Sequence, residues 1–369
     1  MEFRVNSRNL EKLLSKVIPA IPSKTPMTIL TNFLFDINDG LLTVYATDLE
    51  VSIKSQMDIA SDKNKQFVVP AKLLFDTIRE FPDTIVTISL ENNQQLKLKT
   101  DRGTYNLNYF ETKDYPEIPV IESGNEIIIS ADDLNRAFNI TSFAASDEDI
   151  RPAMTGILLD FAEDGLRFVA TDGHRLVKYL KKSYQTELLE RYIIPRKAIH
   201  IISKFLTDSE VKINLTKNLA SFKFSDIELV TKLISDKYPN YNSVIPLENE
   251  NLLTINRADL LSTIRRMMVF ATEGNKQIKL NINSTDLSIS IENVDTSASA
   301  TETIDCEYNG EPMVIGFNVF YLNDIVTHID SEKLIFKLHS PTKACLIEPG
   351  QTSENEEILM LLMPVRLNN

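Results

Sequence analysis

Hydrophobic positions along this chain recur with the period of a β-strand in some segments and with the period of an α-helix in others. Strand-like and helix-like segments follow one another in the same order three times. Residues 68–81 combine a short apolar strand pattern, a proline and apolar positions at helical spacing, and residues 193–205 follow the same plan 125 positions later. Residues 314–325 carry a looser version of it. Apolar residues three and four apart indicate an amphipathic helix, so each copy predicts a strand that leads directly into a helix. The chain is therefore predicted to use one structural unit three times.

Each unit is also predicted to open with a strand, a capping residue and a helix. Asn6, Ser130 and Asn256 follow short apolar strand patterns, and each stands four positions before the first apolar residue of a helical pattern. Asparagine and serine side chains accept hydrogen bonds from the free N–H groups at the start of a helix. Together with the strand–proline–helix pattern, this gives every unit two helices.

The other segments of each unit indicate antiparallel strands. The turn dipeptides Asp39-Gly40 and Asp164-Gly165 lie 125 positions apart between strand patterns. Residues 96–99 and 222–224 alternate apolar and polar positions, which is typical of sheets with one buried face. The predicted fold class is α+β, with three repeated domains that each pack two helices on antiparallel sheets.

Two proline-marked connections suggest where the domains end. Tyr115-Pro116 closes the first unit, and Tyr238-Pro239 begins the connection that closes the second. Proline and polar clusters of this kind mark loops between periodic segments. The predicted domains are residues 1–122, 123–247 and 248–369. This division agrees with the length, because 369 residues are too many for one hydrophobic core.

Composition narrows the classes of protein that fit. The net charge of −13 argues against a simple basic DNA-binding domain, although an acidic exterior can coexist with a basic inner surface. The N-terminus lacks the pattern of a secretory signal, and the chain lacks an apolar run long enough for a membrane span, which predicts a cytoplasmic protein. Cys306 and Cys345 are far apart in sequence and favour reduced thiols, with a disulfide left open.

Two motifs then connect the chain with a known family. On its three-unit plan the chain resembles the bacterial sliding clamps, the β subunit of DNA polymerase III, in Thr171-Asp172-Gly173-His174-Arg175-Leu176 and in Leu361-Leu362-Met363-Pro364-Val365-Arg366-Leu367. The resemblance covers the whole chain and includes Ile315-Gly316-Phe317-Asn318. It implies a non-catalytic homodimer, closed head to tail into a ring around double-stranded DNA, without a cofactor or metal.

The resemblance also implies a peptide-binding cleft between the second and third domains. The cleft would bind short peptides of the replicative polymerase, the clamp loader and repair proteins. An apolar floor with polar groups at its rim is the usual composition of such a pocket. The predicted cleft residues are Met154, Thr171, Gly173, His174, Arg175, Leu176, Pro239, Val244, Asn318, Tyr321, Leu361, Met363, Pro364 and Arg366.

Three positions depart from the pattern of better-known members of the family. Ser243 stands where an arginine is expected, and Asn275 stands where an aromatic residue is frequent. Pro152-Ala153 replaces a pair that is aromatic in some members. The first two changes affect which peptide the cleft prefers, and the third affects contact with template DNA.

Cations on the predicted helices are the candidates for contact with DNA. A charged stripe is usually the solvated side of a helix, but here the pair of cations seven residues apart is repeated in two units. Sliding requires contacts to phosphate without base readout, and a closed ring remains on DNA even when each ionic contact is weak. The predicted DNA-facing residues on the helices are Arg8, Lys12, Lys16, Lys72, Arg79, Arg136, Lys197, Lys204, Arg265 and Arg266. Lys24, in the loop Pro22-Ser23-Lys24-Thr25-Pro26, is added because it resembles a template-contacting loop position of the family.

Four further residues match positions at the junction between two chains in the family. They are Tyr105 and Leu107 of the first domain, and Val269 and Phe270 of the third. The same residue types also suit an ordinary core, and the sequence does not separate the two interpretations.

Two other functions fit parts of the sequence. Asp48 and Asp172 occupy equivalent places, and paired acids can hold magnesium in a nuclease. A turn aspartate that accepts backbone hydrogen bonds is the preferred interpretation, because the third unit has Glu292-Asn293 there. His174 is interpreted as a structural or rim residue, since the four histidines show no zinc-binding spacing.

The second alternative function is that of a monomeric three-domain adaptor that binds peptides only.

Overall fold

The structure is a computed structural model that describes residues 1–61, 63–91, 93–148, 150–185, 188–207, 209–293 and 297–367. The chain forms two compact units, which are distinct from the three repeated domains predicted above. Each compact unit is assembled from two stretches of sequence. The first unit contains Met1–Asp133 and Lys197–Leu233, and the second contains Leu134–Arg196 and Ile234–Asn369. Among the described residues, no helix is long and apolar enough to cross a membrane.

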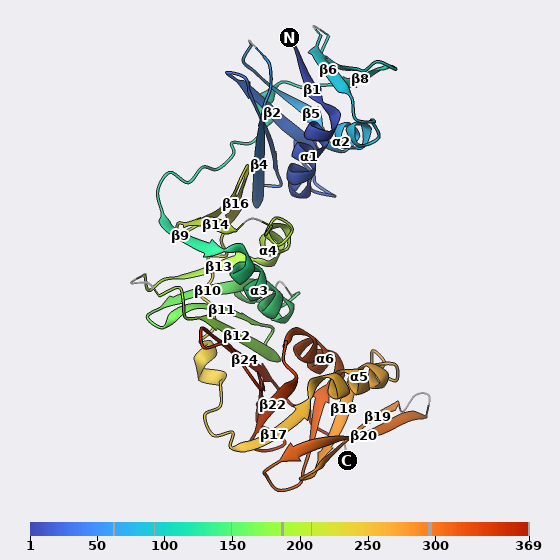
Figure 1. The fold of residues 1–369 in the computed structure, drawn as a ribbon, viewed down its shortest axis with the longest axis vertical. Coiled ribbons are helices and arrows are strands. Elements are labelled where there is room, and N and C mark those ends of the chain that lie inside the picture. The colour runs from blue at the N-terminus through green and yellow to red at the C-terminus, as the bar shows by residue number, and fades with distance from the viewer. Residues whose placement is uncertain are drawn as a thin grey trace. The chain divides into compact units, whose positions relative to one another are not determined.

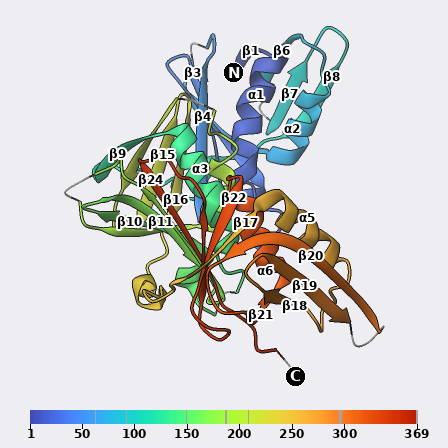
Figure 2. The same cartoon turned by 60° about the horizontal axis from the view of Figure 1, so that its bottom comes forward.

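Six helices lie within the described ranges, two in each predicted domain (Figure 1). They are α1 (Ser7–Val17), α2 (Ala71–Arg79), α3 (Ala131–Thr141), α4 (Arg196–Ile202), α5 (Arg257–Met268) and α6 (Val319–His328). Within the first unit α1 packs against α2, and within the second unit α5 packs against α6, as Figure 2 shows. The prediction of two helices per repeat is confirmed.

The predicted capping residues form the expected hydrogen bonds. The Asn6 side chain accepts from the backbone N–H groups of Arg8 and Asn9, and Asn256 does the same for Ala258 and Asp259. The Ser130 hydroxyl accepts from the backbone N–H of Asp133 at 3.0 Å. Each cap satisfies donors that the first helical turn cannot pair internally.

The end of α4 differs from the prediction. The pattern predicts a helix that carries both Lys197 and Lys204, but α4 ends at Ile202. Beyond it, the backbone N–H groups of Lys204 and Phe205 donate to carbonyls only three residues back. The Phe205 ring then packs against Phe224, with centroids 6.1 Å apart. Lys204 therefore lies in a turn, and its seven-residue spacing from Lys197 does not place both on one helix face.

The first unit contains two antiparallel sheets. The smaller has the order β1 (Glu2–Asn6), β6 (Ile85–Leu90), β7 (Gln95–Lys99) and β8 (Thr104–Asn108). The larger has the order β5 (Lys65–Pro70), β2 (Asn32–Asn38), β3 (Leu41–Thr47), β4 (Val51–Asp58), β16 (Ile227–Lys232), β15 (Leu219–Phe224), β14 (Glu210–Leu215) and β9 (Asn125–Ser130). Because β4 pairs with β16, this sheet joins strands of the first and second predicted domains.

The second unit contains one long antiparallel sheet. Its order is β13 (Arg191–Pro195), β10 (Gly156–Ala162), β11 (Gly165–Thr171), β12 (Arg175–Lys181), β24 (Glu356–Leu362), β23 (Cys345–Pro349), β22 (Lys333–Leu338), β17 (Asn251–Asn256), β20 (Ala298–Tyr308), β19 (Asp286–Asn293), β18 (Gln277–Ile282) and β21 (Met313–Asn318). The β12–β24 pairing joins the second and third predicted domains. The antiparallel prediction is confirmed for these strands.

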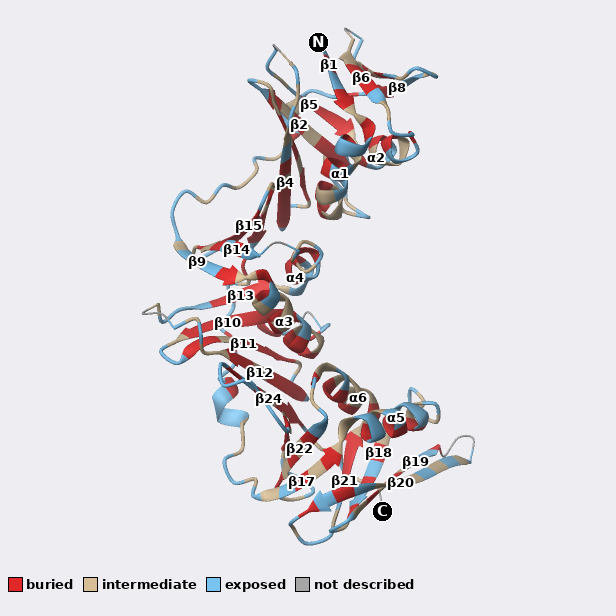
Figure 3. Ribbon diagram, in the orientation of Figure 1, coloured by how far each residue is buried: buried red, intermediate tan, exposed pale blue. Residues whose placement is uncertain are grey.

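The helices and sheets bury their apolar faces against one another. Figure 3 shows buried residues along one stripe of α1 and α5 and along the strands beneath. Leu10 and Leu14 of α1 are fully buried, as are Leu260 and Ile264 of α5. Each such side chain contributes about 1.5–3 kcal/mol on leaving water. Both cysteines are buried free thiols, and burial raises the pKa of Cys306 to about 11.

A buried carboxylate stabilises the β12–β24 pairing. Glu356, only 6% exposed, accepts from Arg136 Nε at 2.9 Å, from Arg136 Nη2 at 2.6 Å and from the Tyr179 hydroxyl at 2.9 Å. Burial raises the pKa of Glu356, but the hydrogen bonds from Arg136 and Tyr179 outweigh it and hold the pKa below its ordinary value of 4.5. The carboxylate therefore remains charged in the folded protein.

Glu356→Gln is expected to lower the free energy of unfolding at pH 7 by about 1–3 kcal/mol, because it leaves the Arg136 charge unpaired. The folded pKa lies below the unfolded one, so this contribution is complete above about pH 4.5 and is lost as the pH falls through the folded pKa. Urea unfolding at pH 7 and pH 3 measures both effects. The control is Glu357→Gln, whose exposed ion pair with Lys182 should contribute within about 0.5 kcal/mol. Equal effects of the two substitutions would contradict the prediction.

Candidate functional site

The turn between β11 and β12 is closed by its own side chains. The Asp172 carboxylate accepts from the backbone N–H groups of His174 and Arg175, both at 2.9 Å. The Thr171 hydroxyl donates to the Arg175 carbonyl at 2.7 Å and accepts from the Gly173 N–H at 3.1 Å. Gly173 has φ of +89°, a conformation that favours glycine. Asp172 thus acts as a turn aspartate, as the sequence predicts.

Asp48 plays the same part in the first repeat. Its carboxylate accepts from the N–H groups of Glu50 at 2.9 Å and Val51 at 2.7 Å, and it also pairs with Lys197. Both aspartates therefore bond to their own turns, and their carboxylates have structural partners.

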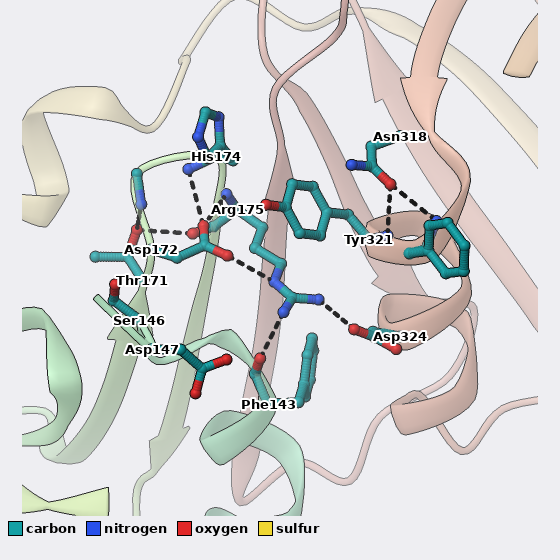
Figure 4. A network of polar contacts seen from close by, with 12 residues as sticks. Phe143, Ser146, Asp147, Thr171, Asp172, His174, Arg175, Asn318, Tyr321 and Asp324 are labelled. Atoms are coloured by element: carbon teal, nitrogen blue, oxygen red, sulfur yellow. Dashed lines mark hydrogen bonds and ion pairs between the residues drawn. The ribbon is translucent and has the colours of Figure 1, made fainter. Parts of the chain in front are cut away.

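Arg175 connects this turn to α6. Figure 4 shows its guanidinium between three acceptors: Nε donates to Asp172 at 3.0 Å, Nη1 to Asp324 at 2.5 Å, and Nη2 to the Phe143 carbonyl at 2.7 Å. The same group lies over the rings of Tyr321, 4.6 Å from the centroid, and Phe143, 5.2 Å from the centroid. Arginine suits this position because its planar fork can donate in several directions while its faces stack.

His174 and Tyr321 form the exposed side of the same network. Their rings stack with centroids 5.9 Å apart, and the His174 carbonyl accepts from the Met363 N–H at 2.9 Å. Burial and then the nearby Asp172 carboxylate raise the pKa of the Tyr321 phenol, which stays a neutral hydrogen-bonding group. The turn, α6 and the C-terminal segment therefore meet at one place.

An apolar cluster lies beside this network. Leu158 and Val169 are fully buried, and Leu176 and Leu361 face each other across β12 and β24. The cluster's buried members are Ala153, Leu158, Val169, Leu176, Ile193, Tyr238, Tyr241, Leu346 and Leu361. Ile234, Ile245, Ala344 and Leu359 are partly buried against it. These side chains form the apolar part of the region in which the cleft is predicted.

Two tyrosines fix the connection that follows β16. The Tyr238 hydroxyl donates to the Val169 carbonyl at 3.3 Å, and the Tyr241 hydroxyl donates to Asp160 at 2.5 Å. Asp160 is buried and also accepts two hydrogen bonds from Arg191. Burial, followed by the hydrogen bond to Asp160, raises the pKa of Tyr241 to about 12. These anchors hold the connection that carries Pro239 and Val244.

The C-terminal segment after β24 runs beside β21. The Val365 N–H donates to the Gly316 carbonyl at 2.9 Å. A Cβ on Gly316 would lie 3.1 Å from the Val365 carbonyl oxygen, which is a tight contact, so glycine suits the close approach of this segment. Asn318 accepts from the N–H groups of Phe320 at 3.0 Å and Tyr321 at 3.4 Å and so caps α6.

The predicted cleft residues fall into three groups. Thr171, Gly173, His174, Arg175, Tyr321 and Met363 belong to the polar network just described. Leu176 and Leu361 belong to the apolar cluster, and Met154 is buried. Pro239, Val244, Asn318, Pro364 and Arg366 lie on the adjoining connection, the α6 cap and the C-terminal segment, with Val244 55% exposed.

Sequence reasoning missed several residues that build the site. Asp324 and Phe143 hold Arg175, and Tyr238 and Tyr241 anchor the connection. Asp324 lies three positions after Tyr321, so both lie on one face of α6. That spacing is the signal that could have identified it.

Many of the predicted DNA-facing cations have acidic partners. Lys16 pairs with Asp226 at 2.6 Å, and Arg266 pairs with Glu302 at 2.6 Å. Arg8, Lys72, Arg79, Arg136 and Lys197 are also in ion pairs. Within the described ranges, Lys12, Lys24, Lys204 and Arg265 are exposed and lack an acidic group within ion-pair distance.

The predicted interface residues differ in exposure. Val269 is 81% exposed and Tyr105 is 42% exposed, and the Tyr105 ring packs beside Phe81 at 4.9 Å. Leu107 is 5% exposed and belongs to the core. Phe270 is intermediate.

Comparison with known proteins gives a consistent result over the whole chain. Sequence models of the N-terminal, central and C-terminal domains of the DNA polymerase III beta subunit match residues 1–119, 128–240 and 242–366. The beta sliding clamps of Pseudomonas aeruginosa and Haemophilus influenzae are 29% and 28% identical, with full coverage of each chain. The crystal structure of a sliding clamp from Bartonella birtlesii bound to griselimycin has a TM-score of 0.94 at 30% identity, and that of the Pseudomonas aeruginosa subunit has 0.93 at 29%, each covering both chains fully.

Proposed function

The chain belongs to the DNA polymerase III beta subunit family, the beta sliding clamps, and on that premise we propose that two copies close head to tail around double-stranded DNA. The ring tethers the replicative polymerase to its template and so makes synthesis processive. It acts in the cytoplasm, has no catalytic activity of its own and requires no cofactor. The domains are proposed to be residues 1–122, 123–247 and 248–369.

The observation that carries this proposal is the site around Arg175. Three segments distant in sequence, the β11–β12 turn, α6 and the C-terminal segment, meet there beside an apolar cluster. A short extended peptide can place aliphatic side chains on that cluster while its backbone bonds to polar groups at the rim. The polymerase, the clamp loader and repair proteins are the proposed peptide donors.

The cations without acidic partners provide the proposed contacts to DNA. Lys12, Lys24, Lys204 and Arg265 can each approach a phosphate without first breaking an ion pair. Four such contacts per chain give weak, salt-sensitive attraction that does not depend on sequence. Arg136 would contribute less, because its guanidinium already donates to Glu356.

The proposal is tested by the native mass in solution. A ring of two chains has twice the 41.9 kDa of one chain. Val269→Asp should shift the protein to the mass of one chain, because it places a charge on a side chain that is 81% exposed at the proposed junction. Leu189→Asp, at another exposed apolar position, is the control and should leave the dimer intact. A single-chain mass for the unmodified protein at micromolar concentration would favour the monomeric adaptor instead.

A further inference from the structure

The first unit contains a cavity that the proposed function does not use. It has a volume of about 220 Å³ and lies on the face of the larger sheet opposite the buried Phe35 and Val44. Residues two apart on a strand share a face, and the cavity's wall is the cross-strand row Leu34, Tyr45, Lys54 and Glu228. An engineered cavity of about 150 Å³ holds a benzene molecule. This one therefore has room for a leucine-sized side chain and part of a neighbouring group.

The connection after β8 covers one side of the cavity. Ile118, Pro119 and Val120 line it, and Val120 is 68% exposed at the mouth. Ser52 forms the floor and is only 4% exposed. The Ser52 hydroxyl bonds to the Thr47 hydroxyl at 2.8 Å. The cavity thus has an apolar lid, a buried floor and an accessible entrance.

The internal repeat relates this cavity to the apolar cluster of the second unit. Leu34, Tyr45 and Ser52 lie 124 positions before Leu158, Val169 and Leu176. The sheet registers agree independently, because Ser52 pairs with Val230 across β4 and β16 as Leu176 pairs with Leu361 across β12 and β24. The cavity and the cluster therefore occupy equivalent positions in two copies of the repeated domain.

The chemistry of the two places differs. Serine at position 52 is smaller than leucine at 176, which leaves space in the first copy that a side chain fills in the second. The charges differ as well. Asp160, 124 positions after Asp36, pairs with Arg191 and Arg167, whereas Asp36 accepts from the neutral Gln66 amide at 3.0 Å, and Lys54 pairs with Glu228 at 2.8 Å. Two carboxylates against one ammonium leave a net negative charge, which favours a cationic ligand.

From these observations we propose that the cavity is a second peptide-binding site. Its occupant is a short segment of a partner protein that places an aliphatic side chain over Ser52 and a lysine or arginine beside Asp36. The comparison with the cleft rests on the proposed function, whereas the cavity, its register and its charges do not.

The test uses methyl NMR of the full-length protein, labelled at isoleucine and valine methyl groups. The probes are the acetylated and amidated tetrapeptides Ala-Leu-Lys-Ala and Ala-Leu-Glu-Ala. The lysine peptide should shift the signals of Ile118, Val120 and Val230, and the glutamate peptide should bind about tenfold more weakly, a difference of about 1.4 kcal/mol. Asp36→Asn should reduce that preference severalfold without changing the shape of the site.

Two further variants separate this site from the cleft. Ser52→Leu fills the cavity and should abolish the shifts, while His174→Ala alters only the proposed cleft and should leave them unchanged. Asp36 is half-buried at the rim, so Asp36→Asn still tests the proposal if Ser52→Leu does not fold. Absence of shifts with both peptides, equal affinity for the two, or loss of the shifts in His174→Ala would overturn the second site. None of these results bears on the native mass, which tests the proposed function separately.

Discussion

Cutting a circular DNA is expected to release the protein from it, whereas an intact circle retains it. Each ionic contact to phosphate is weak, and non-specific binding of this kind has a Kd of about 10⁻⁴–10⁻⁶ M at physiological salt. Retention on a circle must then come from the closed ring rather than from affinity. Protein loaded onto nicked circular DNA by the clamp loader should leave at least about tenfold faster after linearisation by a restriction enzyme. Gel filtration of the complex before and after cutting measures the release.

Salt and substitution provide the controls for this experiment. Binding to short open DNA should fall steeply with salt, and Lys12→Ala should reduce the salt slope by about 1 because it removes one phosphate contact. Lys113→Ala, at an exposed lysine outside the proposed set, should leave the slope unchanged. Equal retention on cut and uncut DNA would mean that contacts, not topology, hold the protein, and the ring would be wrong.

Local patterns in the sequence predicted local structure well. The caps at Asn6, Ser130 and Asn256 and the turn at Asp172 depend on hydrogen bonds within a few residues, so the chain itself specifies them. The repeat also transfers information between copies, because Asp48 bonds to its turn as Asp172 does. The end of α4 was missed because the long-range contact between Phe205 and Phe224 competes with helix continuation.

Contacts between distant segments could not be predicted from the sequence. The partner of Lys16 is Asp226, 210 positions away, and the partner of Arg136 is Glu356, 220 positions away. A stripe of cations on one helix can be recognised in a single segment of sequence. The acidic residues that pair with these cations come from distant segments and can be identified only in the folded structure. The predicted DNA-facing set therefore includes cations that have an acidic partner in the fold and cations that have none within the described ranges.

The ion-pair partner of Arg175 in the candidate cleft could not be predicted from the sequence either. The motif identified the residue, but its acceptor Asp324 lies 149 positions later on α6. The structure assigns Arg175 a positioning role, since its fork holds the turn against the helix that carries Tyr321. A role of this kind predicts that the shape of the guanidinium matters as well as its charge.

Arg175→Lys is expected to weaken binding of a partner peptide to the cleft by at least about tenfold, which is about 1.4 kcal/mol. Lysine keeps the charge, but a single ammonium cannot donate to Asp172, Asp324 and the Phe143 carbonyl in the fork geometry or stack on two rings. The turn and α6 then lose their common anchor, and the rim groups on them no longer hold a fixed spacing. Fluorescence anisotropy with a labelled short peptide of the replicative polymerase measures the affinity.

Arg257→Lys is the matched control for that substitution. Arg257 donates to the carbonyls of Val326 at 2.9 Å and Thr327 at 3.0 Å near the C-terminal end of α6, and neither acceptor is a predicted cleft residue. Both substitutions should lower the free energy of unfolding by about 1–3 kcal/mol, because each leaves acceptors unpaired. Only Arg175→Lys should lower peptide affinity, and Asp324→Asn should lower it as well because it removes the acceptor on α6. If Arg257→Lys weakened the peptide equally, the loss would follow from stability alone and the positioning role would be wrong.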